Sequence, residues 1–313
     1  MSLPAAAPGG QNRRALAAGL GCYLIWGASP ALFILMDRAG ASPWEILGQR
    51  ALWAPLWAGG LVLVTGVGGE VLGVLTRPRT LGWLSVSGAL IGSNWAVYIW
   101  AVNNGHNIDS SLGYFINPLL NMAVGALLFR ERIDAVAWTA IALAAIGVAL
   151  QTAALGHLPV ISLFLAVSFC TYGVIRKRVA VEAQTGLLVE CLLIAVPGIA
   201  YLGWLYGNGG GAFGHTLEPS LLLLLAGPLT VAPLALFAWA ARRLPFSTLG
   251  FLQYIGPTLG FLTGIETGET LTPLRAVSFV FIWSGALVFV FGAFRAARAL
   301  RRPISPSSPA GAA

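Results

Sequence analysis

The sequence predicts an all-α integral membrane protein with ten transmembrane helices, built as two inverted repeats of five helices. The first observation is composition: of 313 residues, 57% are hydrophobic and only 9% are charged, against about 25% charged residues in a typical soluble domain. The apolar residues form runs of about 20 residues, the length that crosses a bilayer as a helix. The positions of the basic residues and an internal repeat are the other two observations.

The basic residues gather on one side of the predicted membrane. When ten apolar runs cross it alternately from a cytoplasmic N-terminus, Arg38 and Arg275 fall outside and Arg50 falls within a run. One missed or added helix would reverse every later connection, so the positive-inside rule predicts ten crossings and cytoplasmic N- and C-termini. The other fifteen of the 18 Lys and Arg residues fall in the cytoplasm: Arg13, Arg14, Arg77, Arg79, Arg130, Arg132, Arg176, Lys177, Arg178, Arg242, Arg243, Arg295, Arg298, Arg301 and Arg302.

An internal repeat relates the two halves of the chain. Ala-Val-Tyr-Ile-Trp-Ala at 96–101 returns as Ala-Leu-Phe-Ala-Trp-Ala at 235–240, and Leu-Gly-Tyr-Phe at 112–115 returns as Leu-Gly-Phe-Leu at 249–252. Each half holds five spans, an odd number, so the second half is expected to lie upside down relative to the first. Inverted repeats are typical of secondary transporters, whose halves form alternate openings around a central site.

The predicted elements follow in order along the chain. A cytoplasmic segment, 1–14, ends with two arginines, and the apolar run after it has no small-residue cleavage site, so this run is expected to remain as the first helix. The first repeat, 15–153, holds spans at 15–36, 44–64, 81–102, 110–129 and 135–153. The second repeat, 158–294, holds spans at 158–175, 184–206, 220–241, 247–265 and 273–294. A basic cytoplasmic tail covers 295–313, and two Gly-rich connections, 65–80 and 207–219, are expected at the membrane interface.

Polar side chains inside the third, fourth, eighth and ninth spans predict a central pocket. Polar groups at membrane depth are expensive unless they face protein or water, and repeat symmetry pairs the third span with the eighth and the fourth with the ninth. The expected substrate-binding residues are Asn94, Trp95, Tyr98, Asn117, Gln253 and Tyr254, with Trp100 and Trp239 as second choices. Hydrogen bonding between neighbouring helices is the alternative explanation, and it stays open.

Two charged side chains, Arg50 and Glu190, lie inside predicted spans. They lie at similar depths from opposite faces, which leaves roughly 10 Å between them along the membrane normal, so no direct ion pair is expected. We interpret both residues as candidates for coupling or anion recognition. One hypothesis is that Glu190 takes up a proton and links a proton gradient to transport. The alternative is a carboxyl group hydrogen-bonded to a neighbouring helix.

No cofactor, metal site or catalytic group is expected from the sequence. Cys22, Cys170 and Cys191 lie in apolar spans without the spacing of metal ligands, so they are expected to be small buried side chains. No phosphate-binding Gly-x-x-x-x-Gly-Lys-Ser/Thr loop occurs, which argues against ATP-driven pumping. The net charge of +7 comes from short cytoplasmic connections, so nucleic acid is not an expected partner.

Several long motifs resemble the RarD subgroup of the EamA family, within the drug/metabolite transporter superfamily. They are Asn94-Trp95, residues 100–104, Ser-Leu-Gly-Tyr-Phe-Ile-Asn-Pro at 111–118 and Ser-Thr-Leu-Gly-Phe-Leu-Gln-Tyr-Ile-Gly-Pro at 247–257, with Trp26-Gly27, Arg50 and residues 185–190 also fitting. The resemblance covers about 15–294 and implies a bacterial inner-membrane permease whose third, fourth, eighth and ninth helices line the cavity. The sequence departs from the subgroup at Gly256, where alanine is expected, and at 265–267, where Glu266 adds a carboxylate near the outer mouth.

These observations together predict a secondary transporter that moves a small amphiphilic metabolite or drug by alternating access, with proton coupling left open. Its expected partners are the small-molecule substrate and membrane lipids, and a homodimer stays open as its assembly state. The alternative is a membrane scaffold or sensor on the same fold, which would not need polar stripes on four repeat-related helices. An intramembrane enzyme would need a nucleophile, a base or metal ligands, and none is recognised in the sequence.

Overall fold

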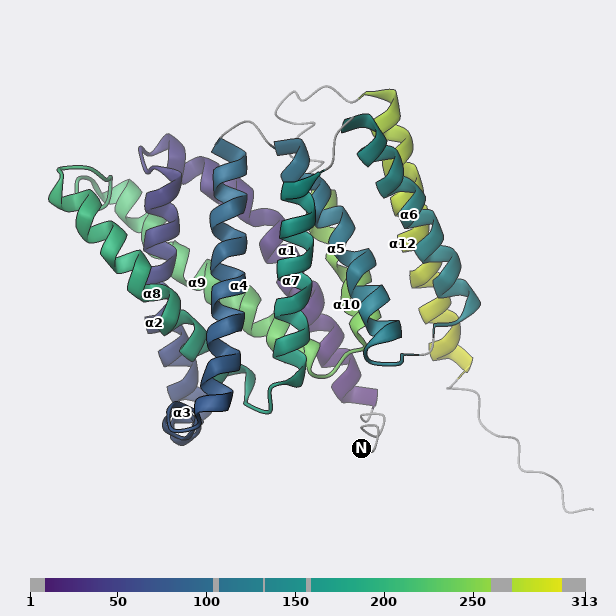
Figure 1. The fold of residues 1–313 in the computed structure, drawn as a ribbon, viewed down its shortest axis with the longest axis horizontal. Helices are drawn as coiled ribbons and strands as arrows, with labels where there is room; N and C mark the ends of the chain where they lie inside the picture. Colours follow the sequence, from purple (N-terminus) through teal and green to yellow (C-terminus); the bar gives the residue numbers. More distant parts are fainter. Residues whose placement is uncertain (1–8, 104–106, 132, 156–158, 260–271, 300–313) are drawn as a thin grey trace, which may run out of the picture.

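The computed structural model describes residues 9–103, 107–131, 133–155, 159–259 and 272–299 (Figure 1). These ranges consist of α-helices and short connections, and no strand occurs in them. The predicted segment 1–14 and tail 295–313 therefore lie largely outside the described residues, as do residues 265–267. The helices are α1 (Gly9–Arg38), α2 (Pro43–Thr65), α3 (Gly68–Leu75), α4 (Pro78–Asn103), α5 (Asn107–Leu127), α6 (Ala135–Leu155), α7 (Val160–Arg178), α8 (Ala183–Gly207), α9 (Leu217–Ala241), α10 (Phe246–Gln253) and α12 (Pro273–Ala299).

Within the described ranges, every predicted span coincides with helical residues, except for 128–129, 159 and the turn at Tyr254. The ninth span, 247–265, is interrupted by a turn at Tyr254 and continues as helix at 255–259, and its remainder lies outside the described residues. Five described helices are long and apolar enough to cross a membrane, or six if α2 and α3 form one span bent by 120°. α4 falls outside this group because serine and asparagine residues interrupt its apolar sequence. α5 and α12 contribute shorter apolar stretches to the described residues, Leu112–Leu127 and Ala276–Phe289. The chain is an all-helical, multi-pass membrane protein.

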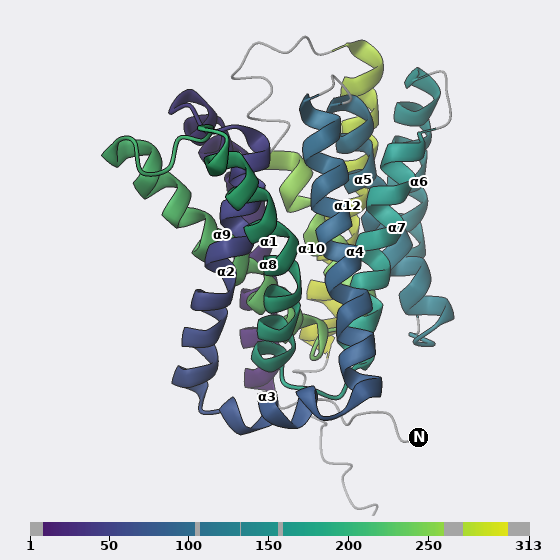
Figure 2. The same ribbon diagram turned by 60° about the vertical axis from the view of Figure 1, so that its left-hand side comes forward.

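Helix α2 shows how local sequence sets its own boundaries. Ser42 caps its start by accepting a hydrogen bond from the Glu45 amide at 3.2 Å, and Pro43 occupies the first turn, where its missing N–H costs nothing. The helix ends at Gly66, whose φ of 71° is left-handed and favours glycine. The chain then turns into α3, which lies across the end of the helices (Figure 2). α3 is the one described helix inside the connection predicted at 65–80.

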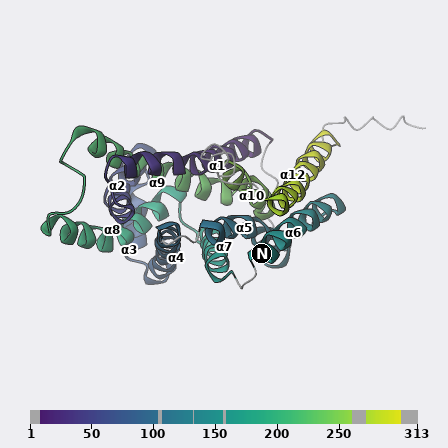
Figure 3. The same cartoon turned by 90° about the horizontal axis from the view of Figure 1, so that it is seen from above.

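The long helices form two rows when seen from above (Figure 3). One row holds α2, α9, α1, α10 and α12, and the other holds α8, α4, α7, α5 and α6. Across the rows, α2 contacts α8, α5 contacts α10, and α6 contacts α12; within the rows, α1 contacts α9 and α4 contacts α7. The outer surfaces carry large apolar side chains such as Leu63 (80% exposed), Val64 (87%) and Leu127 (83%), as expected of a surface that contacts lipid.

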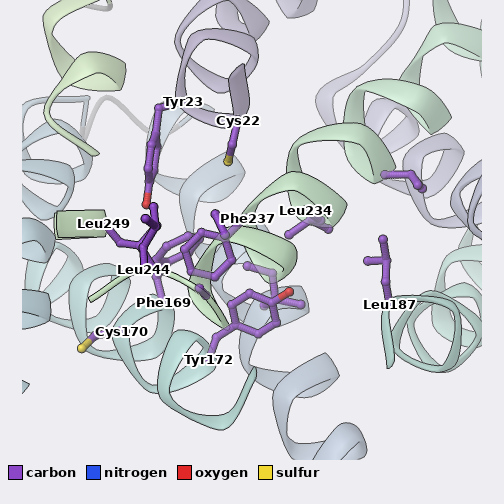
Figure 4. Packing of buried hydrophobic residues seen from close by; sticks show 14 of the residues in the cluster. Cys22, Tyr23, Phe169, Cys170, Tyr172, Leu187, Leu234, Phe237, Leu244 and Leu249 are labelled. Carbon is purple, nitrogen blue, oxygen red and sulfur yellow. The ribbon is translucent and has the colours of Figure 1, made fainter. Parts of the chain in front are cut away.

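Aromatic side chains fill the main interior cluster, between α1, α7, α9 and α10 (Figure 4). The rings of Tyr172 and Phe237 stack with centroids 5.9 Å apart, and Phe169 packs against both. Cys22, Cys170 and Cys191 are buried, free and part of this apolar cluster. A second cluster joins α5, α6, α10 and α12. The two clusters hold the rows together on either side of α5 and α10.

Candidate functional site

Arg50 is a buried cation held by a hydroxyl group and two aromatic rings. It projects from α2 with 8% of its surface exposed. Its Nε donates a hydrogen bond to Thr230 Oγ1 of α9 at 2.9 Å. Its guanidinium carbon lies 4.5 Å from the ring centroid of Trp95 on α4 and 5.3 Å from that of Phe33 on α1, both within cation–π range. No carboxylate of the described residues forms an ion pair with it.

Glu190 is a buried anion on α8, 1% exposed. Its Oε1 accepts a hydrogen bond from Ser87 Oγ on α4 and lies 3.6 Å from Arg176 Nη1 on α7. Arg176 also donates to the carbonyl oxygen of Ala183 at 2.8 Å, which ties the end of α7 to the start of α8. Glu190 Oε2 has no hydrogen-bond partner among the described residues.

Arg176 is a site residue that sequence reasoning missed. Its position next to Lys177 and Arg178 assigned it to a cytoplasmic connection, but the structure buries it to 3% exposure against Glu190. The available signal was the helix itself: Arg176 lies in the last turn of α7, one turn after Tyr172, which is fully buried. Ser87 was missed as well, although it lies seven residues before Asn94 and so on the same face of α4.

Arg50 and Glu190 line one small cavity, together with Trp95, Thr230 and Cys191. Its volume is about 10 Å³, roughly what one water molecule requires. The two charged residues do not pair with each other, in agreement with the expectation from sequence, since Arg50 bonds Thr230 and Glu190 bonds Ser87 and Arg176. Four helices, α2, α4, α8 and α9, supply the charged and polar lining.

A larger groove adjoins this cavity. It has a volume of about 510 Å³ and runs between α2, α4 and α8. Ala51, Trp95 and Ile194 line both spaces. Its lining consists of glycine and of apolar, aromatic or hydroxyl-bearing side chains: Trp44, Leu47, Gly48, Ala51, Ser85, Gly88, Ala89, Gly92, Ser93, Trp95, Ala96, Leu193, Ile194, Pro197, Gly198 and Tyr201.

Three of the predicted binding residues lie on the predicted helices but outside the Arg50 cavity. Asn94 Nδ2 donates to the Leu165 carbonyl oxygen and to Ser168 Oγ, both at 2.9 Å, so Asn94 joins α4 to α7. Trp239 is half-buried, and the guanidinium carbon of Arg243 lies 4.2 Å from its ring centroid. Trp100 is 42% exposed. None of the three lines the Arg50 cavity, and their contact with substrate stays a prediction.

The other predicted residues lie on α4, on α5 and at the end of α10. Asn121 Nδ2 donates to Gln253 Oε1 at 2.8 Å, and the rings of Tyr98 and Tyr114 meet edge to face at 5.5 Å. Asn117 Oδ1 and the Tyr254 hydroxyl are buried without a hydrogen-bond partner in the described part of the chain. Buried polar atoms nearly always have a partner, so these two are candidates for contact with water or a ligand.

Known proteins of high similarity cover nearly the whole chain. An uncharacterized transporter of Pseudomonas aeruginosa is 44% identical over 295 residues, which cover 93% of this chain and 98% of that protein. The RarD proteins of Salmonella typhi and Escherichia coli are 42% and 41% identical over 285 residues, covering 90% of this chain and 96% of each relative.

Comparison of folds gives a consistent result. A protein of known crystal structure matches with a TM-score of 0.68 over 90% of this chain and 98% of that chain, at 19% sequence identity. At this identity the match describes the fold alone. No family model matches the sequence. The identity to the bacterial relatives, sustained over nine-tenths of its length, shows that the chain belongs to the RarD family of membrane transporters.

Proposed function

We propose that this protein is a secondary transporter that moves a small amphiphilic metabolite or drug across the bacterial inner membrane by alternating access. The observation that carries the proposal is the cavity with Arg50 and Glu190, whose lining comes from both halves of the chain: α2 and α4 from the first, α8 and α9 from the second. A site shared between two halves is what alternate opening requires, because movement of one half against the other exposes it to either side.

We propose further that the chain forms ten crossings as two inverted repeats, 15–153 and 158–294. Matching the five spans of each half in order pairs α1 with α7, α2 with α8, α4 with α9, α5 with α10 and α6 with α12. In each of these pairs, one helix lies in one row of Figure 3 and its counterpart lies in the other row. Under this pairing, the contact between α1 and α9 corresponds to the contact between α7 and α4. The contact between α2 and α9 corresponds in the same way to the contact between α8 and α4. The paired helices α2 and α8, α5 and α10, and α6 and α12 contact each other directly.

The proposed orientation places the N- and C-terminal ends in the cytoplasm. α1 begins and α12 ends at the same end of the molecule (Figure 1). α3 also lies at this end (Figure 2), next to Arg77, which precedes α4. Under the positive-inside rule, this end faces the cytoplasm. Fusing reporter proteins after Glu131 and after Gly268 tests the orientation, with the first expected inside and the second outside.

Within this proposal, the predicted residues divide into three groups. Arg50, Glu190 and Trp95 line the central cavity and are the candidates for coupling or anion recognition and for stacking on the substrate. Asn117 on α5 and Tyr254 at the end of α10 each have a buried oxygen without a hydrogen-bond partner in the described residues. Asn94, Tyr98, Gln253, Trp100 and Trp239 stay candidates for contact with substrate in other conformations, as parts of helices that line the proposed path.

Uptake into proteoliposomes tests the proposed transport. The purified protein is challenged with a pooled metabolite and antibiotic mixture, with and without an imposed proton gradient, and the contents are analysed by mass spectrometry. Accumulation of one compound class that is lost in Asn117→Ala is expected. Asn208→Ala serves as the matched control, because Asn208 is exposed at the end of α8 and bonds only Trp204 of its own helix.

Cysteine labelling separates the transporter from a scaffold or sensor of the same fold. The three native cysteines are replaced by alanine, and Asn117→Cys is introduced as the single thiol. A transporter is expected to expose this thiol to a membrane-impermeant reagent from either side as conditions change. Protection under every condition, in a protein shown to be folded, would favour the scaffold.

A further inference from the structure

The guanidinium group of Arg50 is only partly satisfied by protein. It carries five N–H donors, and among the described residues one of them, on Nε, has an acceptor. That acceptor, Thr230 Oγ1, is itself fixed, because it donates to the carbonyl oxygen of Ala226 at 2.7 Å. Trp95 and Phe33 offer ring faces, which attract the charge but leave the donors on Nη1 and Nη2 without acceptors. A fixed guanidinium with free Nη donors is suited to a planar oxyanion.

Among the described residues, the buried charges around the cavity do not balance. Arg50, Arg176 and Glu190 are all buried, and the one carboxylate is already paired with Arg176. This leaves one uncompensated positive charge, on Arg50. Proton uptake by Glu190 would increase the imbalance to two positive charges and would not reverse it. Because an unpaired charge at membrane depth is costly, the site favours a ligand that brings one negative charge.

The groove beside Arg50 offers room for the rest of such a ligand. Its 510 Å³ contrast with about 10 Å³ for the cavity itself. No charged side chain lines it in the described residues, while Trp44, Trp95 and Tyr201 give it aromatic walls. Since Trp95 and Ile194 line both spaces, movement of either side chain joins the groove to the guanidinium of Arg50.

We infer that the substrate is an organic monoanion with an apolar body, whose carboxylate or equivalent oxyanion binds Arg50 while its body lies in the groove between α2, α4 and α8. This inference rests on the proposed transport function and adds the class of substrate. A neutral substrate would leave Arg50 uncompensated, and a cationic one would add a second like charge beside it. The aromatic walls of the groove favour a ring or branched chain as the apolar body.

Three probes that share one body and differ in charge test the inference. They are 3-phenylpropionate, its amide and 3-phenylpropylamine, measured by isothermal titration calorimetry on the purified protein in detergent. Only the carboxylate is expected to bind well, and Arg50→Gln is expected to weaken it about 30-fold or more, as loss of a charge-assisted contact predicts. Arg243→Gln is the matched control, because Arg243 also lies on a tryptophan ring but outside the cavity.

A second variant keeps the test independent of any folding defect in Arg50→Gln. Gly92 lines the groove, and a Cβ atom added there would lie 3.7 Å from Ile194 Cγ1, an ordinary contact. Gly92→Leu places a larger side chain in the groove, and the folded variant is expected to bind 3-phenylpropionate about tenfold or more weakly while acetate binding changes little. A tenfold change corresponds to the loss of about two buried methylene contacts.

The outcomes distinguish the inference from the proposed function. Preference for the carboxylate, lost in Arg50→Gln or Gly92→Leu, supports the inference. Equal binding of the three probes, preference for the amide or amine, or no binding of the carboxylate overturns it. Uptake of the same probes and of the metabolite pool into proteoliposomes is measured in parallel. Transport of neutral or cationic compounds alone would support the proposed transport function and contradict the inferred anionic substrate. Binding of the carboxylate without any transport would keep the anion site and overturn the transport function.

Discussion

Arg50 and Glu190 occupy the same position of two helices that pack against each other. Each lies seven residues after the first residue of its helix, Pro43 in α2 and Ala183 in α8. Arg50 bonds Thr230 on α9, and Glu190 bonds Ser87 on α4. The proposed repeat pairs α4 with α9, so under that proposal each charge bonds a hydroxyl group on one of two paired helices. Opposite charges would then make the two proposed halves chemically different.

The Arg176–Glu190 pair predicts a large stability effect. Both side chains are buried, so Glu190→Gln leaves the Arg176 charge without a counter-ion, and we expect the free energy of unfolding to fall by about 3 kcal/mol or more. The double variant Arg176→Met/Glu190→Met removes both charges and is expected to recover most of this loss. Thermal unfolding of the purified protein in detergent measures both effects.

A half-exposed ion pair provides the comparison. Arg242 Nη1 lies 3.2 Å from Glu182 Oε2, but the side chains are 26% and 46% exposed. Solvent screening reduces the worth of such a pair to about 0–1 kcal/mol, so Glu182→Gln is expected to change unfolding little. A loss in Glu190→Gln as small as that in Glu182→Gln would contradict a tight buried pair.

Glu190 also carries the prediction on proton coupling. Its Oε2 has no hydrogen bond of ordinary geometry among the described residues, and the Tyr172 hydroxyl lies beside the carboxylate. Uptake of a proton at this oxygen would neutralise the carboxylate and release Arg176. We expect uptake in wild-type proteoliposomes to increase with an imposed proton gradient, and uptake in Glu190→Gln to lose that dependence while substrate exchange without a gradient persists. Glu218→Gln, on the exposed start of α9, is the control. Full gradient-driven uptake in Glu190→Gln would exclude the proton role.

The helices were predictable from sequence because bilayer thickness fixes the length of an apolar run. Spans predicted at 44–64 and 135–153 match Pro43–Thr65 and Ala135–Leu155 closely. α3 was not predicted as a helix, because its eight residues include three glycines, which lower helix propensity. Its formation depends on tertiary contacts: Glu70 accepts hydrogen bonds from Thr185 Oγ1 at 2.7 Å and from the Glu182 amide at 3.1 Å.

The site was predictable only in part. A charge within an apolar run is visible in the sequence, so Arg50 and Glu190 were recognised. Their partners were not, since helical periodicity says which face a residue occupies but not which helix covers that face. Asn94 shows the same limit: its position on α4 was clear, yet its contact with Ser168 of α7 depends on the packing of the two rows.

Glu45 connects the start of α2 to the segment that follows α8, at the end of these helices that lies away from α3. It is fully buried and accepts hydrogen bonds from the amides of Ala212 and Phe213 at 2.8–3.0 Å and from the Tyr206 hydroxyl at 2.9 Å. Glu45→Gln weakens these charge-assisted bonds and is expected to lower the free energy of unfolding by about 2–3 kcal/mol. Tyr206→Phe removes one neutral donor and should cost about 1 kcal/mol.

Hydrogen exchange locates the effect of Glu45. The amides of residues 208–216 are expected to exchange faster in Glu45→Gln than in the wild type, because the amides of Ala212 and Phe213 lose a charged acceptor. Glu218→Gln, which changes an exposed carboxylate on the adjoining helix, should leave exchange of this connection unchanged. Unchanged exchange in Glu45→Gln would show that the connection is held by other contacts.

Two glycines, Gly147 on α6 and Gly285 on α12, allow these helices to pack closely against each other. A Cβ added to Gly147 would lie 2.7 Å from the Ser278 carbonyl oxygen, and one added to Gly285 would lie 2.6 Å from the Ala140 carbonyl oxygen. The two glycines are 138 residues apart, within the offset of 137–139 residues seen in the repeated motifs, so the proposed repeat makes them equivalent positions. Because backbone atoms cannot yield as side chains do, we expect Gly147→Ala and Gly285→Ala each to cost about 1–3 kcal/mol.

The control for the two glycines is a helical glycine with open space around it. Nothing lies within 4 Å of a Cβ added to Gly203 on α8, so Gly203→Ala gains helix propensity and is expected to stabilise the protein by up to about 1 kcal/mol. Opposite signs for Gly203→Ala and Gly147→Ala in thermal unfolding would establish that contact, not the loss of glycine, sets the cost. Equal loss in Gly147→Ala and Gly285→Ala is the further expectation, since the same interface is disturbed from its two sides. A neutral or stabilising effect at either position would mean that α6 and α12 do not approach this closely.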